Sequence, residues 1–143
     1  MNKNILNLII GRTIQEIRIM SYYINKQQIA EIIVLYIRLD GGNWIKITTS
    51  DGSNIIEKLD EEPKVIYLED IKDDFAYPIK KIETKYIGGK IECIRNYIYN
   101  NDPFELIGFY FQFNNGFGFS LIEENGCLRL FDGILVKDKY SLV

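Results

Sequence analysis

The chain has 143 residues, of which 47% are hydrophobic and 26% are charged. This length and composition are typical of one globular domain with a buried core and do not fit a disordered protein. The formal net charge of −3 argues against a protein whose main task is binding the phosphates of nucleic acid. The chain contains no histidine, which excludes histidine acid–base catalysis and makes a zinc site of ordinary composition a poor fit.

The N-terminal segment combines a short apolar run with helical spacing. The run at 8–10 is too short for a signal peptide or a membrane span, so we expect a cytoplasmic protein that does not contact membranes. Ile5, Leu8 and Ile9 have helical spacing and precede Gly11, a residue type that commonly ends a helix. The pattern predicts a short helix at the start of the chain.

The sequence repeats itself past its middle. Segments 10–18 and 87–95 share the pattern Gly-x-x-Ile-x-x-Ile-Arg, and segments 36–42 and 110–116 resemble each other in the same order. Repetition of this kind indicates one structural unit used twice. We therefore predict a single domain built by internal duplication. Its parts are repeat one at about 3–59, an acidic connector at about 60–77, repeat two at about 78–133 and a C-terminal tail at 134–143.

Repeat two begins with the same kind of spacing as repeat one. Ile79, Ile82 and Tyr86 are spaced as on one face of a helix and precede a Gly-Gly pair. Pro78 is well placed to begin such a helix. The N–H groups of a first turn have no partner within the helix, so a proline, which lacks an N–H, loses no hydrogen bond there. A second short helix is predicted here.

Alternating apolar and polar residues predict strands with one buried and one exposed face in both repeats. The expected first strands are at about 13–22 and 90–99, and the second strands are at about 29–39 and 106–113. In repeat two, a three-residue loop at 114–116 sets Phe111 opposite Phe119. The same register sets Phe113 opposite Phe117, so the whole aromatic row is expected to face the core.

Repeat one favours the same hairpin geometry independently. A loop at 40–42 sets Ile37 opposite Ile45, and the same register sets Leu35 opposite Ile47. In both repeats a glycine falls where the bulged loop needs a left-handed residue. Two different sequences thus predict one turn geometry.

Turn dipeptides at 51–52 (Asp-Gly) and 125–126 (Asn-Gly) predict tight two-residue hairpins leading to a fourth strand. The resulting pairs are Leu121 with Leu130 in repeat two, and Ile47 with Ile56 and Ile45 with Lys58 in repeat one. Because Lys58 falls opposite a core residue, the fourth strand of repeat one is expected to be shorter, bulged or at an edge.

These elements define the predicted fold class as α+β and mainly antiparallel β. Each repeat is a short helix followed by a four-stranded meander. Such a sheet has an apolar face that must be covered, so we expect the two copies to pack as a sandwich or to merge into one curled, barrel-like sheet.

Acidic residues crowd the connector between the repeats. One interpretation is a solvated linker, and the other is an acidic surface for a basic protein partner. The apolar stretch 65–68 is expected to add an edge strand or a packed extended segment. The acidic residues are Asp60, Glu61, Glu62, Glu69, Asp70, Asp73 and Asp74.

A second candidate surface lies on the outer face of the first sheet. The predicted register sets Trp44 opposite Arg38, and Tyr36 opposite Lys46. A structural role alone would explain these residue types, since cross-strand pairs of this kind stabilise a sheet by roughly 0.2–1 kcal/mol each. The alternative is a binding surface, because Trp, Tyr and Arg dominate binding hot spots.

No residue pattern identifies a reaction. Cys93 and Cys127 have no metal-ligand spacing, and they are expected to be buried free thiols. The acids at 70–74 lack the pattern of a calcium loop, and no phosphate-binding glycine loop is present. We therefore predict no catalytic residue, no metal and no cofactor.

In type, the chain resembles the small cytoplasmic immunity proteins that bacteria pair with secreted toxins. The shared features are a compact acidic domain, a composition rich in Ile, Asn, Lys and Tyr, no histidine, and an acidic stretch that could cover a basic active site. The resemblance implies a non-catalytic protein that binds and neutralises a toxin domain. We expect the connector acids to form that surface, with Tyr67 and Tyr77 as nearby aromatic anchors, on a monomer or weak dimer.

Two other functions remain open from the sequence. One is a small-ligand or regulatory module that uses a cleft between the two repeats. The other is an enzyme that uses carboxylates, tyrosines or Cys127, which is the least favoured because no nucleophile has a recognisable activating neighbour.

Overall fold

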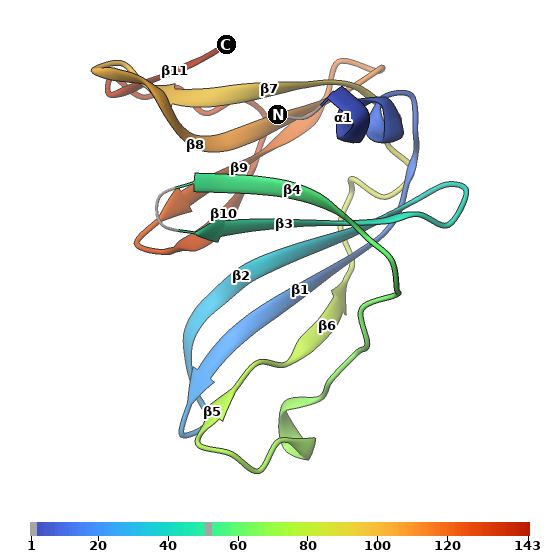
Figure 1. Cartoon of the computed structure of the whole chain (residues 1–143), viewed down its shortest axis with the longest axis vertical. Helices are drawn as coiled ribbons and strands as arrows, with labels where there is room; N and C mark the ends of the chain where they lie inside the picture. Colours follow the sequence, from blue (N-terminus) through green and yellow to red (C-terminus); the bar gives the residue numbers. More distant parts are fainter. Residues whose placement is uncertain (1–2, 51–52) are drawn as a thin grey trace.

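The computed structural model describes residues 3–50 and 53–143 of the chain. Strands dominate these ranges, and they follow a single short helix near the N-terminus (Figure 1). In chain order the elements are α1 (Lys3–Ile9), β1 (Ile14–Ile24), β2 (Gln27–Leu39), β3 (Trp44–Ser50), β4 (Ser53–Leu59), the 3-10 turn η1 (Leu68–Asp70), β5 (Phe75–Ala76), β6 (Ile79–Ile82), β7 (Ile91–Tyr99), β8 (Asp102–Phe113), β9 (Gly118–Glu124), β10 (Cys127–Asp132) and β11 (Tyr140–Leu142).

The strands form two antiparallel sheets. The first has the order β4-β3-β2-β1-β5, with β6 also paired to β1, and the second has the order β10-β9-β8-β7-β11. In Figure 1 the second sheet forms the upper part of the molecule, and β1, β2 and β5 extend the first sheet downward. The sheets do not join into a closed barrel.

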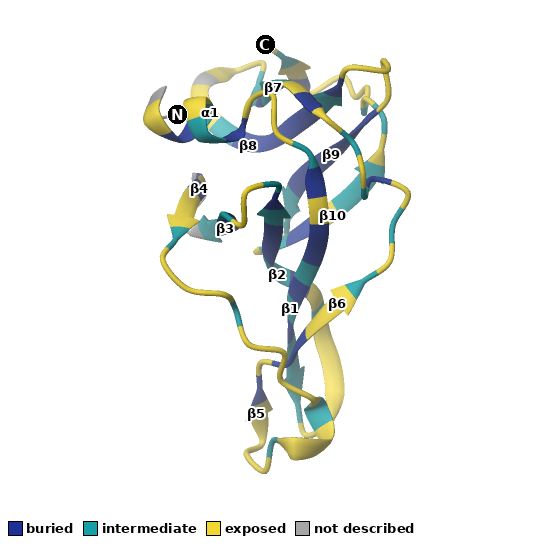
Figure 2. Cartoon of the chain, turned by 90° about the vertical axis from the view of Figure 1, so that its right-hand side faces the viewer, coloured by how far each residue is buried: buried dark blue, intermediate teal, exposed yellow. Residues whose placement is uncertain are grey.

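The main core lies where the two sheets face each other. Ile17 and Leu35 of the first sheet and Phe109 and Leu121 of the second belong to one buried cluster. Figure 2 shows the buried positions concentrated in the middle strands of both sheets. Full burial of a large apolar side chain contributes roughly 1.5–3 kcal/mol, so this cluster is the main source of stability.

Aromatic rings fill the second sheet's side of this core. The rings of Phe111 and Phe119 stack with centroids 4.8 Å apart and an interplanar angle of 12°. Both side chains are fully buried. Tyr86, from the loop between β6 and β7, packs against the same Phe119 ring at 4.8 Å. The loop thereby closes one end of the core.

The C-terminal tail covers the outer face of the second sheet, a role that the sequence analysis did not anticipate. Tyr140, on β11, packs edge to face against the buried ring of Tyr97, with centroids 5.8 Å apart. The Tyr97 hydroxyl shares a hydrogen bond with Ser120 Oγ at 2.6 Å and accepts one from the Leu135 N–H at 3.0 Å. The tail is therefore part of the folded sheet.

The predicted hairpin registers are confirmed in both sheets. Three-residue loops connect the second and third strands, and both Gly42 and Gly116 have left-handed φ angles, at 88° and 86°. Such angles favour glycine because a Cβ atom is strained there. The confirmed pairs are Ile37 with Ile45, Leu35 with Ile47, Phe111 with Phe119, Leu121 with Leu130, Ile47 with Ile56, Ile45 with Lys58, Arg38 with Trp44 and Tyr36 with Lys46.

Other features of the predicted meanders are only partly tested. The fourth strand of repeat one, β4, is at an edge as expected. The turn predicted at 51–52 lies outside the described residues, whereas the turn at 125–126 is observed with positive φ at both positions. The origin of the two meanders by duplication stays a prediction.

The prediction of a second helix is wrong. Residues 79–82 form β6, which pairs with β1 from Met20–Ile79 to Ile17–Ile82. Pro78 begins no helix there; its carbonyl accepts a hydrogen bond from the Ser21 N–H at 3.0 Å. The long free edge of β1 offers this segment backbone partners, and that long-range pairing outweighs the local helical spacing. The first predicted helix is confirmed as α1, which ends before Gly11 with its φ of 85°.

Phe117 is also placed differently from the prediction. The Phe113 N–H donates to the Phe117 carbonyl at 2.8 Å, so the predicted pairing is correct. The Phe117 side chain, however, is 73% exposed, because it lies at the strand end beyond the rim of the core. Alternation gives the face of a residue but not the point where the opposite sheet ends.

Phe119→Ala is expected to lower the free energy of unfolding by about 3–5 kcal/mol, because it leaves a cavity in the stacked aromatic core. Phe117→Ala, two residues away on the same hairpin, should change it by about 0.5 kcal/mol or less. Urea denaturation of both variants measures the difference. Equal losses for the two variants would contradict the placement of the core.

Candidate protein-binding surface

Arg18 on β1 fixes the connector to the first sheet. Its guanidinium donates hydrogen bonds to the Glu16 carboxylate, to the Pro63 carbonyl and, at 2.7 Å, to Glu62 Oε1. Burial by itself would lower the pKa of Arg18, but the hydrogen bonds and charges of Glu16 and Glu62 outweigh it and raise that pKa. Arg18 is therefore a permanent cation that holds the beginning of the connector across the sheet.

The connector and its neighbours cover the outer face on which the second candidate surface was predicted. The Arg18 guanidinium lies over the Trp44 ring, 4.6 Å from its centroid. Trp44 is 5% exposed and Tyr36 is 7% exposed, and both pack with Ile79 of β6. Their predicted position on the outer face is correct, but that face is closed. The two aromatic rings act as packing residues in this structure, and only Arg38 remains half-exposed.

The predicted acidic residues fall into two groups along the connector. Residues 60–62 follow β4 directly, and Glu62 is already paired with Arg18. Residues 69–74 follow later, where the chain descends from β4 to the lower end of the molecule (Figure 1). All seven acids are exposed. Among the described residues, Glu69, Asp70, Asp73 and Asp74 make no ion pair.

Backbone pairing holds the second acidic group in place. Ile66 forms reciprocal backbone hydrogen bonds with Ile79, each 3.0 Å long, so this part of 65–68 is extended as predicted. Its side chains are not packed, however, because residues 65–67 are all exposed. The Asn25 N–H donates to the Asp74 carbonyl at 2.7 Å, and β5 pairs with the end of β1. These acids therefore project from a supported loop.

Three aromatic side chains of the same segment are exposed. The exposed fractions are 59% for Tyr67, 58% for Phe75 and 48% for Tyr77. The Tyr77 ring stacks on Tyr22 of β1, with centroids 5.0 Å apart. Tyr67 and Tyr77 were expected from the sequence, whereas Phe75 was missed although it lies next to the acidic run.

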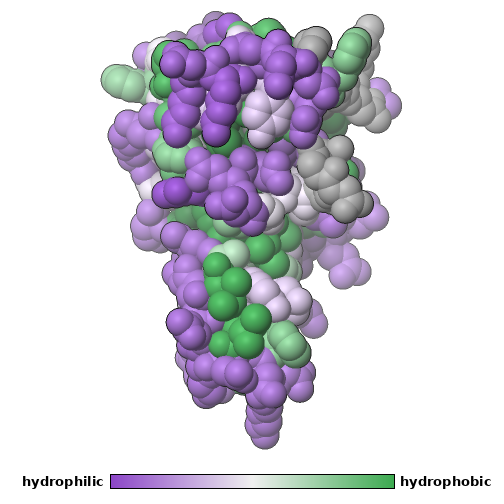
Figure 3. Space-filling model, turned by 90° about the vertical axis from the view of Figure 1, so that its left-hand side faces the viewer, coloured by the Kyte–Doolittle hydropathy of each residue, from purple (hydrophilic) through white to green (hydrophobic). Residues whose placement is uncertain are grey.

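We define the connector face as Tyr67, Glu69, Asp70, Asp73, Asp74, Phe75 and Tyr77. Figure 3 shows a hydrophobic area in the lower half of the molecule, bordered by hydrophilic groups that include its lower tip. Ile29 of β2, which is 55% exposed, adds apolar surface to this end of the molecule. The connector face thus combines unpaired carboxylates with exposed rings.

A polar hollow of about 410 Å³ lies beside Trp44, where the two predicted surfaces meet. Arg38 and Lys58 line it together with residues 60–62. Arg38 Nε is buried without a hydrogen-bond partner, and Arg38 Nη2 is 3.8 Å from Glu16 Oε1. The hollow contains charges of both signs and is open to solvent.

A groove of about 520 Å³ lies between the sheets, where the sequence analysis placed a possible ligand cleft. Ile19, Ile32 and Leu128 form part of its apolar lining, and Cys127 lies on its wall. Cys127 and Cys93 are both free thiols, but they are half-buried rather than fully buried as expected. The Cys127 thiol contacts the Glu124 carbonyl at 3.1 Å.

The described residues contain no group of three or more His, Cys, Asp or Glu side chains arranged to hold a metal ion. Within 3–50 and 53–143, no helix has the length and apolar character needed to cross a membrane. Comparison of the chain with protein-family models, curated proteins and solved structures found no match. The function proposed below therefore rests on the geometry of the described residues.

Replacing Arg18 tests how the connector is held. Arg18→Met should lower the free energy of unfolding by about 3 kcal/mol, because the buried Glu16 loses its main partner. Glu62→Gln, which removes an exposed carboxylate from the same cation, should cost about 1 kcal/mol or less. Hydrogen exchange should show faster exchange over 60–66 in Arg18→Met. If both variants behave alike, Arg18 does not anchor the connector.

Proposed function

We propose that this protein is a non-catalytic binding module that recognises a basic protein domain through the connector face. In keeping with its resemblance to immunity proteins, the bound domain is a toxin that the complex inactivates. The observation that carries the proposal is the combination of four unpaired carboxylates with three exposed aromatic rings on one supported segment.

The two kinds of residue have complementary roles in binding. Tyrosine and other aromatic side chains supply much of the energy of protein interfaces, because they bury a large area at a small entropic cost. Carboxylates attract a basic partner and orient it as it approaches, which mainly raises the association rate. A cationic side chain of the partner could also lie over Tyr67 or Phe75.

The support beneath the connector face favours binding over a purely structural linker. Arg18 and β5 fix the connector to β1, and the Ile66–Ile79 bridge fixes it to β6. A segment that is already ordered loses less conformational entropy when it binds. A solvated linker has no need of such fixed points.

Selection of displayed peptides tests the surface without a known partner. Random peptides selected on the wild-type protein should be rich in Lys and Arg. Their affinity should fall about tenfold or more, equivalent to about 1.4 kcal/mol, on a variant that reverses the charge of the face. That variant carries Glu69→Lys, Asp70→Lys, Asp73→Lys and Asp74→Lys.

A matched variant reverses four exposed acids elsewhere: Glu83→Lys, Glu92→Lys, Glu105→Lys and Asp138→Lys. It should retain the affinity of the wild type. An equal loss for both variants would show that only overall charge matters, and would remove the connector face from the proposal.

The toxin assignment needs a second experiment. The product of a toxin-like gene beside the gene for this chain should co-elute with it as a stable complex, and co-expression should restore growth. The charge-reversed connector variant should lose both effects while its circular dichroism spectrum stays unchanged. Rescue of growth by that variant would refute the assignment.

A further inference from the structure

A slot lies at the end of the second sheet, away from the connector face. It has a volume of about 430 Å³, and its walls come from the loop before β7, the β8–β9 turn and the end of β10. We define the slot by Lys85, Tyr86, Phe113, Asn115, Phe117 and Asp132. It shares no residue with the connector face, so it stands independently of the function proposed above.

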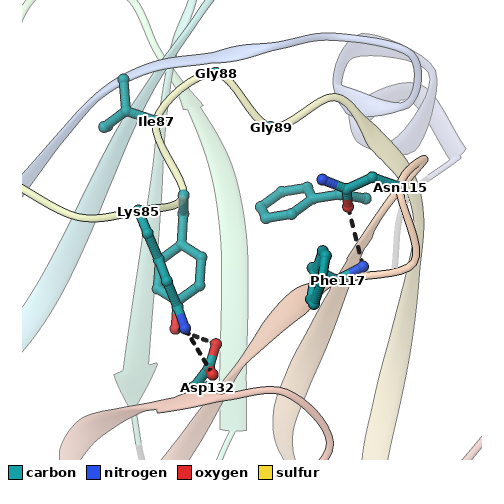
Figure 4. Close-up of a pocket in the computed structure, with 9 residues that line it drawn as sticks. Lys85, Ile87, Gly88, Gly89, Asn115, Phe117 and Asp132 are labelled. Carbon is teal, nitrogen blue, oxygen red and sulfur yellow. Dashed lines mark hydrogen bonds and ion pairs between the residues drawn. The ribbon is translucent and has the colours of Figure 1, made fainter.

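The walls of the slot are aromatic. Tyr86 is 7% exposed and Phe113 is 3% exposed, and their ring centroids are 6.2 Å apart. Phe117, in contrast, is 73% exposed at the mouth of the slot. Figure 4 shows Phe117 and Asn115 across the slot from Lys85 and Asp132. A planar ring that enters between these two sides would cover the Phe117 ring, whose surface the chain leaves open.

Gly89 lets the backbone approach the Phe113 ring closely. Gly88 and Gly89 line the slot, and a Cβ atom on Gly89 would come within 2.8 Å of the Phe113 ring. Such a contact is too short for any side chain. Gly89 therefore brings the backbone directly against the aromatic wall of the slot.

The polar end of the slot is formed by Asp132. Its carboxylate accepts hydrogen bonds from Lys85 Nζ at 2.8 Å and from the Tyr86 hydroxyl at 3.0 Å. These hydrogen bonds hold the pKa of Asp132 below its ordinary value. Burial, together with the bond to Asp132, raises the pKa of Tyr86 to about 12. At neutral pH the phenol is thus a donor and Asp132 is an anion.

Lys85 and Asp132 present a hydrogen-bond donor beside an acceptor at this end. Both side chains are more than half exposed, so their ion pair contributes little to stability and can open to admit a ligand. Asn115 adds polar capacity on the other side: its Oδ1 accepts from the Phe117 N–H at 3.0 Å, and its amide nitrogen faces the slot (Figure 4).

We propose that the slot binds a planar heterocycle with a lactam edge, of the guanine class. The ring N–H of such a ligand donates to Asp132, and the adjacent C=O accepts from Lys85. The ring itself lies between the Tyr86 and Phe117 side chains. The net charge of −3 disfavours a nucleic acid strand, so the source of the ring is a free nucleoside or base.

Titration of the full chain with guanosine tests the slot. Two-dimensional NMR spectra should show saturable shifts at the Gly88 and Gly89 amides and at the Asn115 side chain. Guanosine methylated at N1, which lacks the ring N–H, should bind about tenfold more weakly because Asp132 is left without a donor from the ring. Equal binding of the two nucleosides, or no saturable shift with guanosine, would overturn the proposal.

Variants separate the walls from the polar end. Phe117→Ala removes an exposed ring and Asp132→Asn removes the anion, and each should weaken guanosine binding about tenfold. Phe104→Ala removes a ring that is 96% exposed elsewhere on the second sheet, and it should leave binding unchanged. Unchanged affinity for both slot variants would place guanosine elsewhere on the protein.

Two further ligands test the chemical class and its source. N-acetyltryptophanamide is flat and aromatic but has no lactam, and binding as tight as that of guanosine would refute the role of the lactam edge. A guanine-containing single-stranded octamer should bind no tighter than guanosine. Tighter binding of the octamer would retain the lactam chemistry and overturn the free nucleoside as its source.

Discussion

The structure depends on burying two unlike apolar faces against each other. The first sheet presents aliphatic residues such as Ile17 and Leu35, and the second presents the stacked rings of Phe111 and Phe119. Neither face is stable in water alone, because a sheet with one apolar side needs a covering layer. Pairing these inner faces leaves both outer faces uncovered. The connector closes the outer face of the first sheet, and the C-terminal tail closes that of the second.

The covers differ in the kind of contact that holds them. The tail joins β7 as a strand and adds Tyr140 to an apolar cluster around Tyr97. The connector is attached by the Arg18 cation, by one backbone bridge and by the short β5. A cover held at a few points leaves much of its own surface in solvent. This explains why exposed aromatic and acidic side chains accumulate on the connector.

Sequence reasoning succeeded where structure follows from neighbouring residues. Alternation and turn chemistry gave the pairs Ile37–Ile45 and Phe111–Phe119, since a shift by one residue would turn an apolar row to the wrong face. Sequence reasoning failed where the structure of a segment is determined by contacts with residues far away in the sequence. Residues 79–82 became a strand because β1 has a free edge, and the contact of Arg18 with Pro63 spans 45 positions. Trp44 was placed on the correct face, but its burial involves residues distant in the sequence, since Arg18 lies over its ring and Ile79 belongs to the same buried cluster.

The residues of the slot were even harder to predict from the sequence. Tyr86 was expected on a helix and Phe117 in the core, while Asp132 carried no pattern at all. One signal in the sequence could have indicated that Phe117 is exposed. The hairpin register puts Phe117 at the last position of the aromatic row, next to the turn, where the core can end before the strand does. A large apolar residue at such an end is either covered by another segment or left open. Here the loop carrying Tyr86 approaches without covering it, since the Tyr86 hydroxyl is directed to Asp132. The exposed ring and the polar pair therefore arise from one arrangement, in which the loop closes the core but leaves the rim of the sheet accessible.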